Sequence, residues 1–235
     1  MSHHACSHHS SDGHNIVGCV SRVPIFNRLP VEQMNEIRQV VQSITIDKGE
    51  IMYHAGDRSD SLYIVNKGKI KIYRLSESGK EQLVRILQPG DFTGELALFQ
   101  QRIHESYAEA MESSQICQIK SEDLQQFLLK YPTISIKILS EFANRLESAE
   151  KQTANVATEK VETRIAMYLV DCLESEQSSS NTIELPMSKK DLASYLGTTP
   201  ETLSRRLREF EKSGFIRQQG QRQIKIIDPD ALLLI

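Results

Sequence analysis

The spacing of apolar residues changes along the chain and divides it into parts of different structure. Between Ile44 and Cys117, short β-branched runs alternate with turns every seven to twelve residues, which predicts the strands of a small β-sandwich or barrel. The turns are marked by Gly49, Gly56, Gly68, Gly79 and Gly90. Before the strands, the segment Val20–Thr45 is expected to be helical, around Leu29, Met34, Ile37 and Val40.

Helical spacing returns after the predicted strands, first at Ser121 and then in a long helix expected from Thr133 to about Ala157. One stripe of this long helix repeats at steps of three and four residues: Leu139, Phe142, Leu146, Ala149, Thr153 and Val156. Such a stripe is typical of a coiled-coil seam and favours a homodimer, although a face packed within one chain would repeat in the same way.

A further helix is expected to start at Thr158 and Glu159 and to bury Val161, Ile165, Leu169 and Leu173. The Ser-rich stretch ESEQSSSN after it has the composition of a loop.

Residues 187–215 carry the start and stop signals of two helices joined by a turn. Ser188 is positioned as an N-cap with Asp191 three residues later, and Gly197 ends this first helix. Thr199 is positioned to cap a second helix, with Pro200 at its first helical residue.

The second helix is predicted to have an apolar side and a polar side. Leu203, Leu207 and Phe210 form the inner stripe. The outward residues are Glu201, Thr202, Ser204, Arg205 and Arg208. In a helix-turn-helix the start of the second helix enters the major groove of DNA, where Arg pairs with guanine and Glu accepts from cytosine. A helix pair with solvated charges is the plain alternative.

Charge favours the DNA-binding interpretation. Residues 186–228 contain nine Lys and Arg against five Asp and Glu, whereas the whole chain has a formal net charge of −3. The segment FIRQQGQRQIKIID, residues 215–228, predicts a hairpin around Gly220 in which Arg217, Arg222 and Lys225 reach phosphates, as the wing of a winged helix does.

A chain of 235 residues with 39% apolar residues is long enough for two domains. It has no apolar run long enough for a membrane helix and no secretory leader pattern, so a cytoplasmic location is expected.

In the order of its parts the sequence resembles the family of bacterial regulators that contains the cyclic AMP receptor protein and FNR. The motifs that carry the resemblance are GDRSDSLYIVNKGKIKIY, LQPGDFTGELALF and DLASYLGTTPETLSRRLREFEKSGFI. The resemblance implies an α+β fold: a cyclic-nucleotide-binding-like β-roll (a double-stranded β-helix), a long dimerisation helix and a C-terminal winged helix-turn-helix. We expect a His- and Cys-rich arm at 1–19, the roll at 20–131, the dimerisation helix at 132–157 and the DNA-binding domain at 158–235. Double-stranded DNA, RNA polymerase and a second copy of the chain are the implied partners.

Two places in the sequence indicate the FNR branch, and the chain resembles Gram-positive FNR-like proteins in particular. Glu105 stands beside Ser106 where a cyclic-nucleotide pocket of the family has an Arg for the cyclic phosphate, which argues against cyclic AMP. Glu201, Ser204 and Arg205 match the E-x-x-S-R pattern of FNR proteins, which implies that Arg205 reads guanine in a TTGAT-like half-site of a palindrome. Ser188, Lys189, Thr199 and Thr202 match phosphate-contacting positions of the family.

The cysteines of the sequence are compatible with three chemistries for sensing a signal. FNR proteins hold an iron-sulfur cluster with N-terminal cysteines and one cysteine in the roll, but this chain offers only Cys6, Cys19 and Cys117 for a cluster that takes four thiolates. Zinc bound by these cysteines and the N-terminal histidines, or a reversible disulfide between Cys117 and an N-terminal cysteine, are the other chemistries. Cys172 lies in a helical stripe and is expected to be a buried small residue.

Two other functions compete with a redox- or metal-responsive regulator. One is a regulator controlled by a small effector bound in the roll. The other is a cupin-like metalloenzyme, for which the roll supplies only His54 and His104, so an enzyme is not expected.

Overall fold

The computed structural model describes residues 23, 25–27, 29–98, 102–175 and 181–235. The described residues form two compact units: one holds those up to Lys71 and those within Leu87–Leu139, and the other holds Ile72–Ile86 and those within Ser140–Ile235. The N-terminal arm expected at 1–19 lies outside the described residues.

The first helix is shorter than the sequence predicts. Helix α2 spans Val31–Val40, because Pro30 occupies its N-cap position and the chain turns extended at Val41. The prediction of helix up to Thr45 is wrong: residues Gln42–Ile46 form strand β1, which pairs with Ser114–Lys120, strand β10. Thr45 and its β-branched neighbours fit a pleated, half-buried strand better than a helix.

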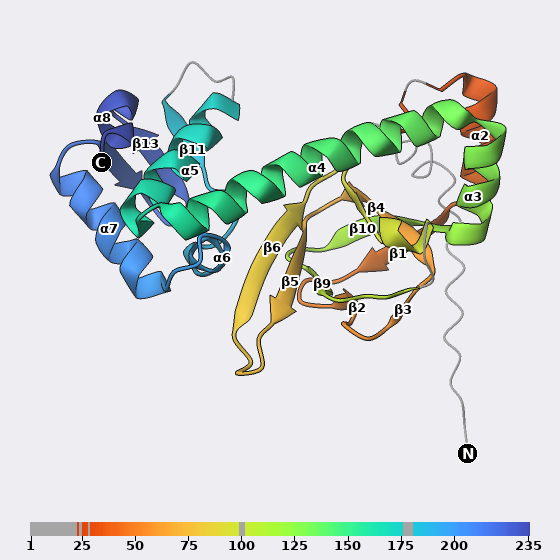
Figure 1. The fold of residues 1–235 in the computed structure, drawn as a ribbon, viewed down its shortest axis with the longest axis horizontal. Coiled ribbons are helices and arrows are strands. Elements are labelled where there is room, and N and C mark those ends of the chain that lie inside the picture. The colour runs from red at the N-terminus through yellow and green to blue at the C-terminus, as the bar shows by residue number, and fades with distance from the viewer. Residues whose placement is uncertain (1–22, 24, 28, 99–101, 176–180) are drawn as a thin grey trace. The chain divides into compact units, whose positions relative to one another are not determined.

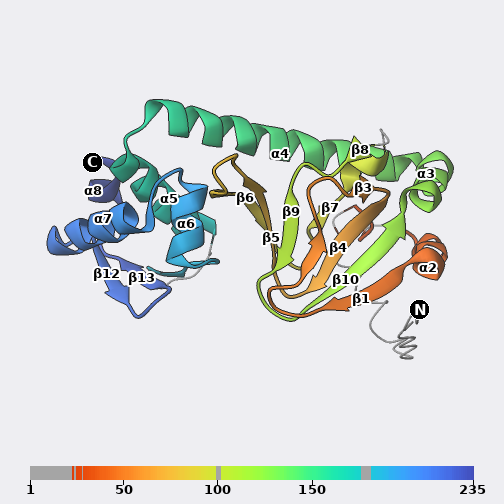
Figure 2. The ribbon, with the colours of Figure 1, turned by 90° about the horizontal axis from the view of Figure 1, so that it is seen from below.

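The predicted roll is confirmed as two four-stranded sheets (Figure 2). The first sheet has the order β1-β10-β4-β7, with β4 at Ser61–Lys67 and β7 at Phe92–Thr93. The second has the order β2-β9-β5-β6, with β2 at Ile51–Tyr53, β9 at Tyr107–Ala110, β5 at Ile70–Leu75 and β6 at Glu81–Leu87. A short pair joins β3, Arg58–Ser59, to β8, Arg102–Ile103, and the 3-10 helix η1 covers Glu95–Leu98.

Two glycines of the roll have no room for a side chain. A Cβ on Gly94 would lie 2.2 Å from the carbonyl oxygen of Ser61, and one on Gly68 would lie 2.2 Å from Ser114 Oγ. Both residues also have positive φ, at 83° and 90°. Gly94 of the GEL motif is therefore required by the packing of the roll itself.

Helix α3, Ser121–Lys130, is followed by the long helix α4, Pro132–Thr158 (Figure 1). Ile134 and Ile138 near its start are buried. In contrast to these two isoleucines, three residues of the predicted stripe are exposed: the exposed fractions of Leu139, Leu146 and Val156 are 60%, 61% and 45%. Leu139 and Leu146 therefore do not belong to a core within one chain, and Val156 is only partly covered.

The next helix, α5, spans Val161–Ser175, so the predicted start at Thr158 and Glu159 is wrong. Thr158 is the last residue of α4, and its hydroxyl donates to the carbonyl of Ala154 at 3.0 Å, as a threonine inside a helix does. Ile165 and Leu169 are buried, as the stripe predicts. The Ser-rich loop lies mostly outside the described residues.

The C-terminal part is a winged helix-turn-helix (Figure 1). Helices α6, Lys189–Tyr195, and α7, Pro200–Lys212, are followed by strands β12, Ile216–Gln219, and β13, Gln223–Ile226. The sequence did not predict β11, Thr182–Glu184, which pairs with β13 and completes a three-stranded sheet, or the short C-terminal helix α8, Pro229–Leu233. The α+β fold class is thus confirmed.

Candidate DNA-binding surface

Both helices of the motif begin at the residues that the sequence marks. The Ser188 hydroxyl accepts from the Asp191 backbone N–H at 3.1 Å and donates to the Asp191 carboxylate at 2.6 Å. The Thr199 hydroxyl accepts from the Thr202 backbone N–H at 3.2 Å, with Pro200 at the first helical residue. These caps fix where α7 starts, and therefore which side chains its first turns present.

Helix α7 separates an apolar from a polar side as predicted. Leu203, Leu207 and Phe210 are buried, whereas Glu201, Arg205 and Arg208 are exposed. Thr202 and Ser204 are half-buried between them. The residues predicted to meet DNA from α7 are therefore together on its solvent side.

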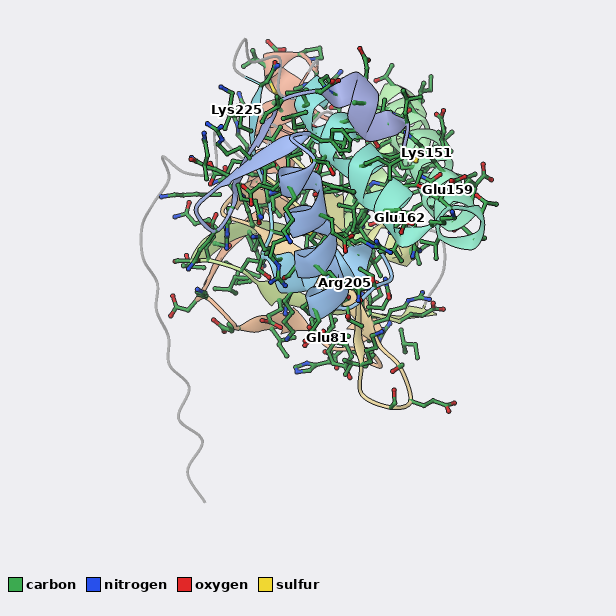
Figure 3. The ribbon with its side chains drawn as sticks, turned by 90° about the vertical axis from the view of Figure 1, so that its left-hand side faces the viewer. Glu81, Lys151, Glu159, Glu162, Arg205 and Lys225 are labelled. Atoms are coloured by element: carbon green, nitrogen blue, oxygen red, sulfur yellow. The ribbon has the colours of Figure 1, made fainter. Side chains whose placement is uncertain are left out.

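The three arginines of α7 differ in what holds them. Arg206 is engaged, with one nitrogen 2.7 Å from Glu209 and another 3.4 Å from Glu162 on α5. Arg208 Nε donates to the Ser204 carbonyl at 3.2 Å. Among the described residues, Arg205 has neither a hydrogen bond nor an ion pair, and Figure 3 shows it projecting from α7. Its guanidinium is available for a base edge.

Lys189 is held by the wing, a contact that the sequence did not predict. Its Nζ donates to Gln218 Oε1 at 2.7 Å, and Gln218 in turn donates its backbone N–H at 2.7 Å and its side-chain amide at 3.1 Å to the carboxylate of Glu211. The Gln218 hydrogen bonds, with smaller contributions from Lys189 and Arg217, hold the pKa of Glu211 below its usual value. The network joins the start of α6 to strand β12 and to the end of α7.

The wing carries three exposed cations, Arg217, Arg222 and Lys225. Arg217 and Lys225 are direct cross-strand partners in the register of β12 and β13 (Figure 3 labels Lys225). Like charges placed opposite each other destabilise a sheet, and this cost is removed when both meet an anion such as the phosphate backbone.

Cys117 is buried at the centre of the roll, 1% exposed on β10, opposite Ser43 of β1 and Ile64 of β4. It is disulfide-bonded. Cys172 is not part of a disulfide and is half-buried, less than the buried position that the sequence predicts. The other two cysteines, Cys6 and Cys19, lie outside the described residues. A sulfur engaged in a disulfide is not a thiolate ligand, so Cys117 in this state does not fit a cluster or a zinc site.

The roll histidines lie in different surroundings. His54 is exposed and its Nδ1 is 3.3 Å from Asp57 Oδ2. His104 is 8% exposed and stacks on Tyr53 with ring centroids 3.7 Å apart. Within the described residues, no group of three or more metal-binding side chains comes together.

Glu105, which stands where the resemblance implies an arginine in cyclic-nucleotide-binding members, is exposed, and Ser106 beside it is half-buried. None of the described helices has the length and apolar character needed to cross a bilayer.

A β-roll joined to a winged helix-turn-helix with an available arginine defines a DNA-binding regulator with a sensor domain. Family models agree: residues 43–131 match the cyclic nucleotide-binding domain and residues 163–235 the Crp-like helix-turn-helix domain. The chain is similar to a probable transcriptional regulator of Lacticaseibacillus casei, with 34% identity over 90% of this chain and 95% of the relative. It is also 31% identical to a fumarate and nitrate reduction regulatory protein of Shigella dysenteriae, over 88% of this chain and 82% of the relative.

Among solved structures, FixK2 from Bradyrhizobium japonicum has a TM-score of 0.72 and 26% identity, over 82% of this chain and 96% of FixK2. The chain belongs to the Crp/Fnr family of transcription regulators. It is a DNA-binding regulator and not an enzyme.

Proposed function

We propose that the protein acts as a homodimer that reads a palindromic, TTGAT-like DNA site. Two features of α7 together support the proposal. The Thr199 cap fixes where α7 starts, and Arg205, within the first two turns, is exposed and has neither a hydrogen bond nor an ion pair among the described residues. Arg205 would pair with guanine, and Glu201 and Ser204 would read neighbouring bases. Ser188, Lys189, Thr199 and Thr202 would contact phosphates at the ends of α6 and α7, and Arg208 would lie along the same face.

The dimer is supported by the exposed stripe of α4. Leu139, Leu146 and Val156 are exposed at helical spacing on one long helix, which is costly in water and favourable against a second copy. A twofold pair of proteins places two recognition helices on two half-sites, and a palindrome follows from that symmetry.

Arg205→Ala tests the base-reading role. We expect a loss of about 1–3 kcal/mol of DNA-binding free energy and relaxed selection at one guanine of each half-site.

Lys189→Ala should weaken binding to all sequences alike and lower the salt dependence, because a phosphate contact carries no base information. Lys212→Ala, at the far end of α7, is the matched control. Fluorescence anisotropy with a panel of single-base variants measures all three. Equal loss on every sequence for Arg205→Ala would contradict the assignment.

The signal that we propose is redox. Cys117 and one of Cys6 and Cys19 would exchange between two thiols and a disulfide, with two electrons and two protons passing to an oxidant such as a small disulfide or oxygen. The disulfide at Cys117 supports this chemistry over a metal or cluster. The anaerobic regulatory proteins among its relatives, such as that of Haemophilus influenzae, 30% identical, point to the same class of signal.

Thiol counting before and after oxidation tests the redox proposal. The wild-type protein should lose two free thiols on treatment with oxidised glutathione and should change its affinity for the palindrome. Cys117→Ser should lose both responses, and Cys172→Ser should keep both because Cys172 is not part of a disulfide. Iron or zinc that co-purifies in fixed ratio with the reduced protein would instead favour the cluster or the zinc site.

The alternative of a small effector in the roll is tested separately. Glu105 would repel a cyclic phosphate, so titration calorimetry with cyclic AMP should show no binding.

We also propose RNA polymerase as a partner and a cytoplasmic location. We assign the roll to residues 20–131, the dimerisation helix to 132–157 and the DNA-binding domain to 158–235.

A further inference from the structure

A cavity lies within the C-terminal unit, where the last turns of α4 meet α5 and the end of α6. Its volume is about 220 Å³, the share of roughly seven water molecules in the liquid. No base-reading residue of α7 lines it. Its lining includes charged, aromatic and apolar side chains: Lys151, Arg164, Met167, Tyr168, Asp171 and Tyr195.

Arg164 is the unusual member of the lining. It is 8% exposed, and its Nε has no hydrogen-bond partner among the described residues. Nη1 makes only a 3.5 Å contact with the carbonyl of Val156. The nearby carboxylate of Glu162 is instead 3.4 Å from Arg206. A buried guanidinium without a carboxylate is costly, and an anion entering the cavity would remove that cost.

The other residues that line the cavity determine which kind of anion it fits. Lys151 lies 3.5 Å from Asp171, and both side chains are more than half exposed, so this pair forms a polar rim (Figure 3 labels Lys151 on α4). The rings of Tyr168 and Tyr195 lie with centroids 5.7 Å apart at 59°, and Met167 adds an apolar wall. Aromatic walls with one buried guanidinium suit a flat apolar body that carries a single carboxylate.

The cavity also touches the turn that precedes the recognition helix. A Cβ on Gly197 would lie 3.5 Å from Arg164 Nη1 and 3.7 Å from Val156 Cγ1. The guanidinium therefore lies beside the α6–α7 turn, at a distance that a single added carbon on Gly197 would close. A ligand that draws Arg164 toward itself would change the packing under this turn, and binding of ligand and DNA would then be coupled in both directions.

We propose that this cavity binds a small aromatic monocarboxylate through Arg164 and couples it to the position of the helix-turn-helix. The binding step is independent of the proposed function, and only the coupling rests on it. The ligand class follows from the volume, the buried cation and the two tyrosine rings.

Benzoate is the probe, and benzamide is its uncharged counterpart of the same shape. Titration calorimetry with the full chain in the absence of DNA should show benzoate binding, with benzamide weaker by about tenfold or more. Arg164→Met should lose benzoate binding to the same degree, and Arg164→Lys should retain part of it because charge remains while the planar fork is lost. Equal binding of benzoate and benzamide, or unchanged binding by Arg164→Met, would overturn the proposal, and so would no binding by the wild type.

Lys151→Ala provides the test if Arg164→Met does not fold, because Lys151 is exposed and its removal leaves the core unchanged. It should weaken benzoate binding about two- to threefold and leave benzamide unchanged. Identical titrations for this variant and the wild type would overturn the placement of the ligand in the cavity. DNA affinity with and without benzoate then tests the coupling alone: a change supports it, and no change removes it while leaving the binding site.

Discussion

At the scale of single residues, the structure distinguishes cations that the sequence cannot rank. Arg205 and Arg206 are neighbours, but Arg206 is held by Glu162 and Glu209 whereas Arg205 is exposed and unengaged among the described residues. Helical periodicity predicted which of the two faces solvent. It could not predict the Lys189–Gln218 contact, because that pair is distant in sequence and depends on how the wing folds back.

His104 should make the stability of the protein depend on pH. Burial lowers its pKa below the ordinary 6.5, against smaller raising effects of Asp57, Asp60 and Glu95. The unfolded chain therefore binds a proton at a higher pH than the folded protein does. The stabilisation is present above about pH 6.5 and decreases as the pH falls toward the folded value.

His104→Phe keeps a ring against Tyr53 and removes the titrating group. Urea denaturation from about pH 7 to 5 should show a flatter decline of unfolding free energy for this variant than for the wild type. Equal slopes for His104→Phe and wild type would contradict the assignment.

At the scale of elements, the sequence predicted best where local signals decide. The caps at Ser188 and Thr199 and the glycine turns of the roll are encoded within a few residues, and all appear at the expected positions. Prediction from the sequence failed where an element depends on a pairing partner that is distant along the chain. Strand β1 was predicted as helix because its pairing with β10 cannot be seen locally, and β11 is too short to show a period.

The Thr199 cap should be worth about 0.5–2 kcal/mol of unfolding free energy, because its removal leaves the Thr202 N–H without an acceptor at the start of α7. Thermal denaturation of Thr199→Ala measures this loss. Thr198→Ala is the neighbouring control and should stay within about 0.5 kcal/mol of wild type.

Helix α4 allows a direct test of the dimer. Leu146→Glu places a charge in the exposed apolar stripe and should shift the protein toward monomers in sedimentation velocity, because the carboxylate would have to be buried between two copies. Asn144→Glu adds the same charge elsewhere on α4 and should leave the dimer. Dissociation by both variants, or by neither, would contradict the proposed seam.

At the scale of the whole molecule, charge is divided between its parts. The chain has a net charge of −3, but nine basic residues against five acidic ones lie between residues 186 and 228, where the recognition helix and wing are. Association with DNA should therefore be steered by this part alone and should weaken as salt rises. The sequence predicted this division and the family. It could not predict the cavity at Arg164, which depends on three helices meeting.

The most direct test of the central claim is selection of bound sequences from random double-stranded DNA by the reduced and the oxidised wild-type protein, with Arg205→Ala alongside. We expect the wild type to enrich an inverted repeat of TTGAT-like half-sites, in one redox state more than in the other, and Arg205→Ala to lose one guanine preference in each half-site. Enrichment of an asymmetric sequence, or of no sequence in either redox state, would contradict it.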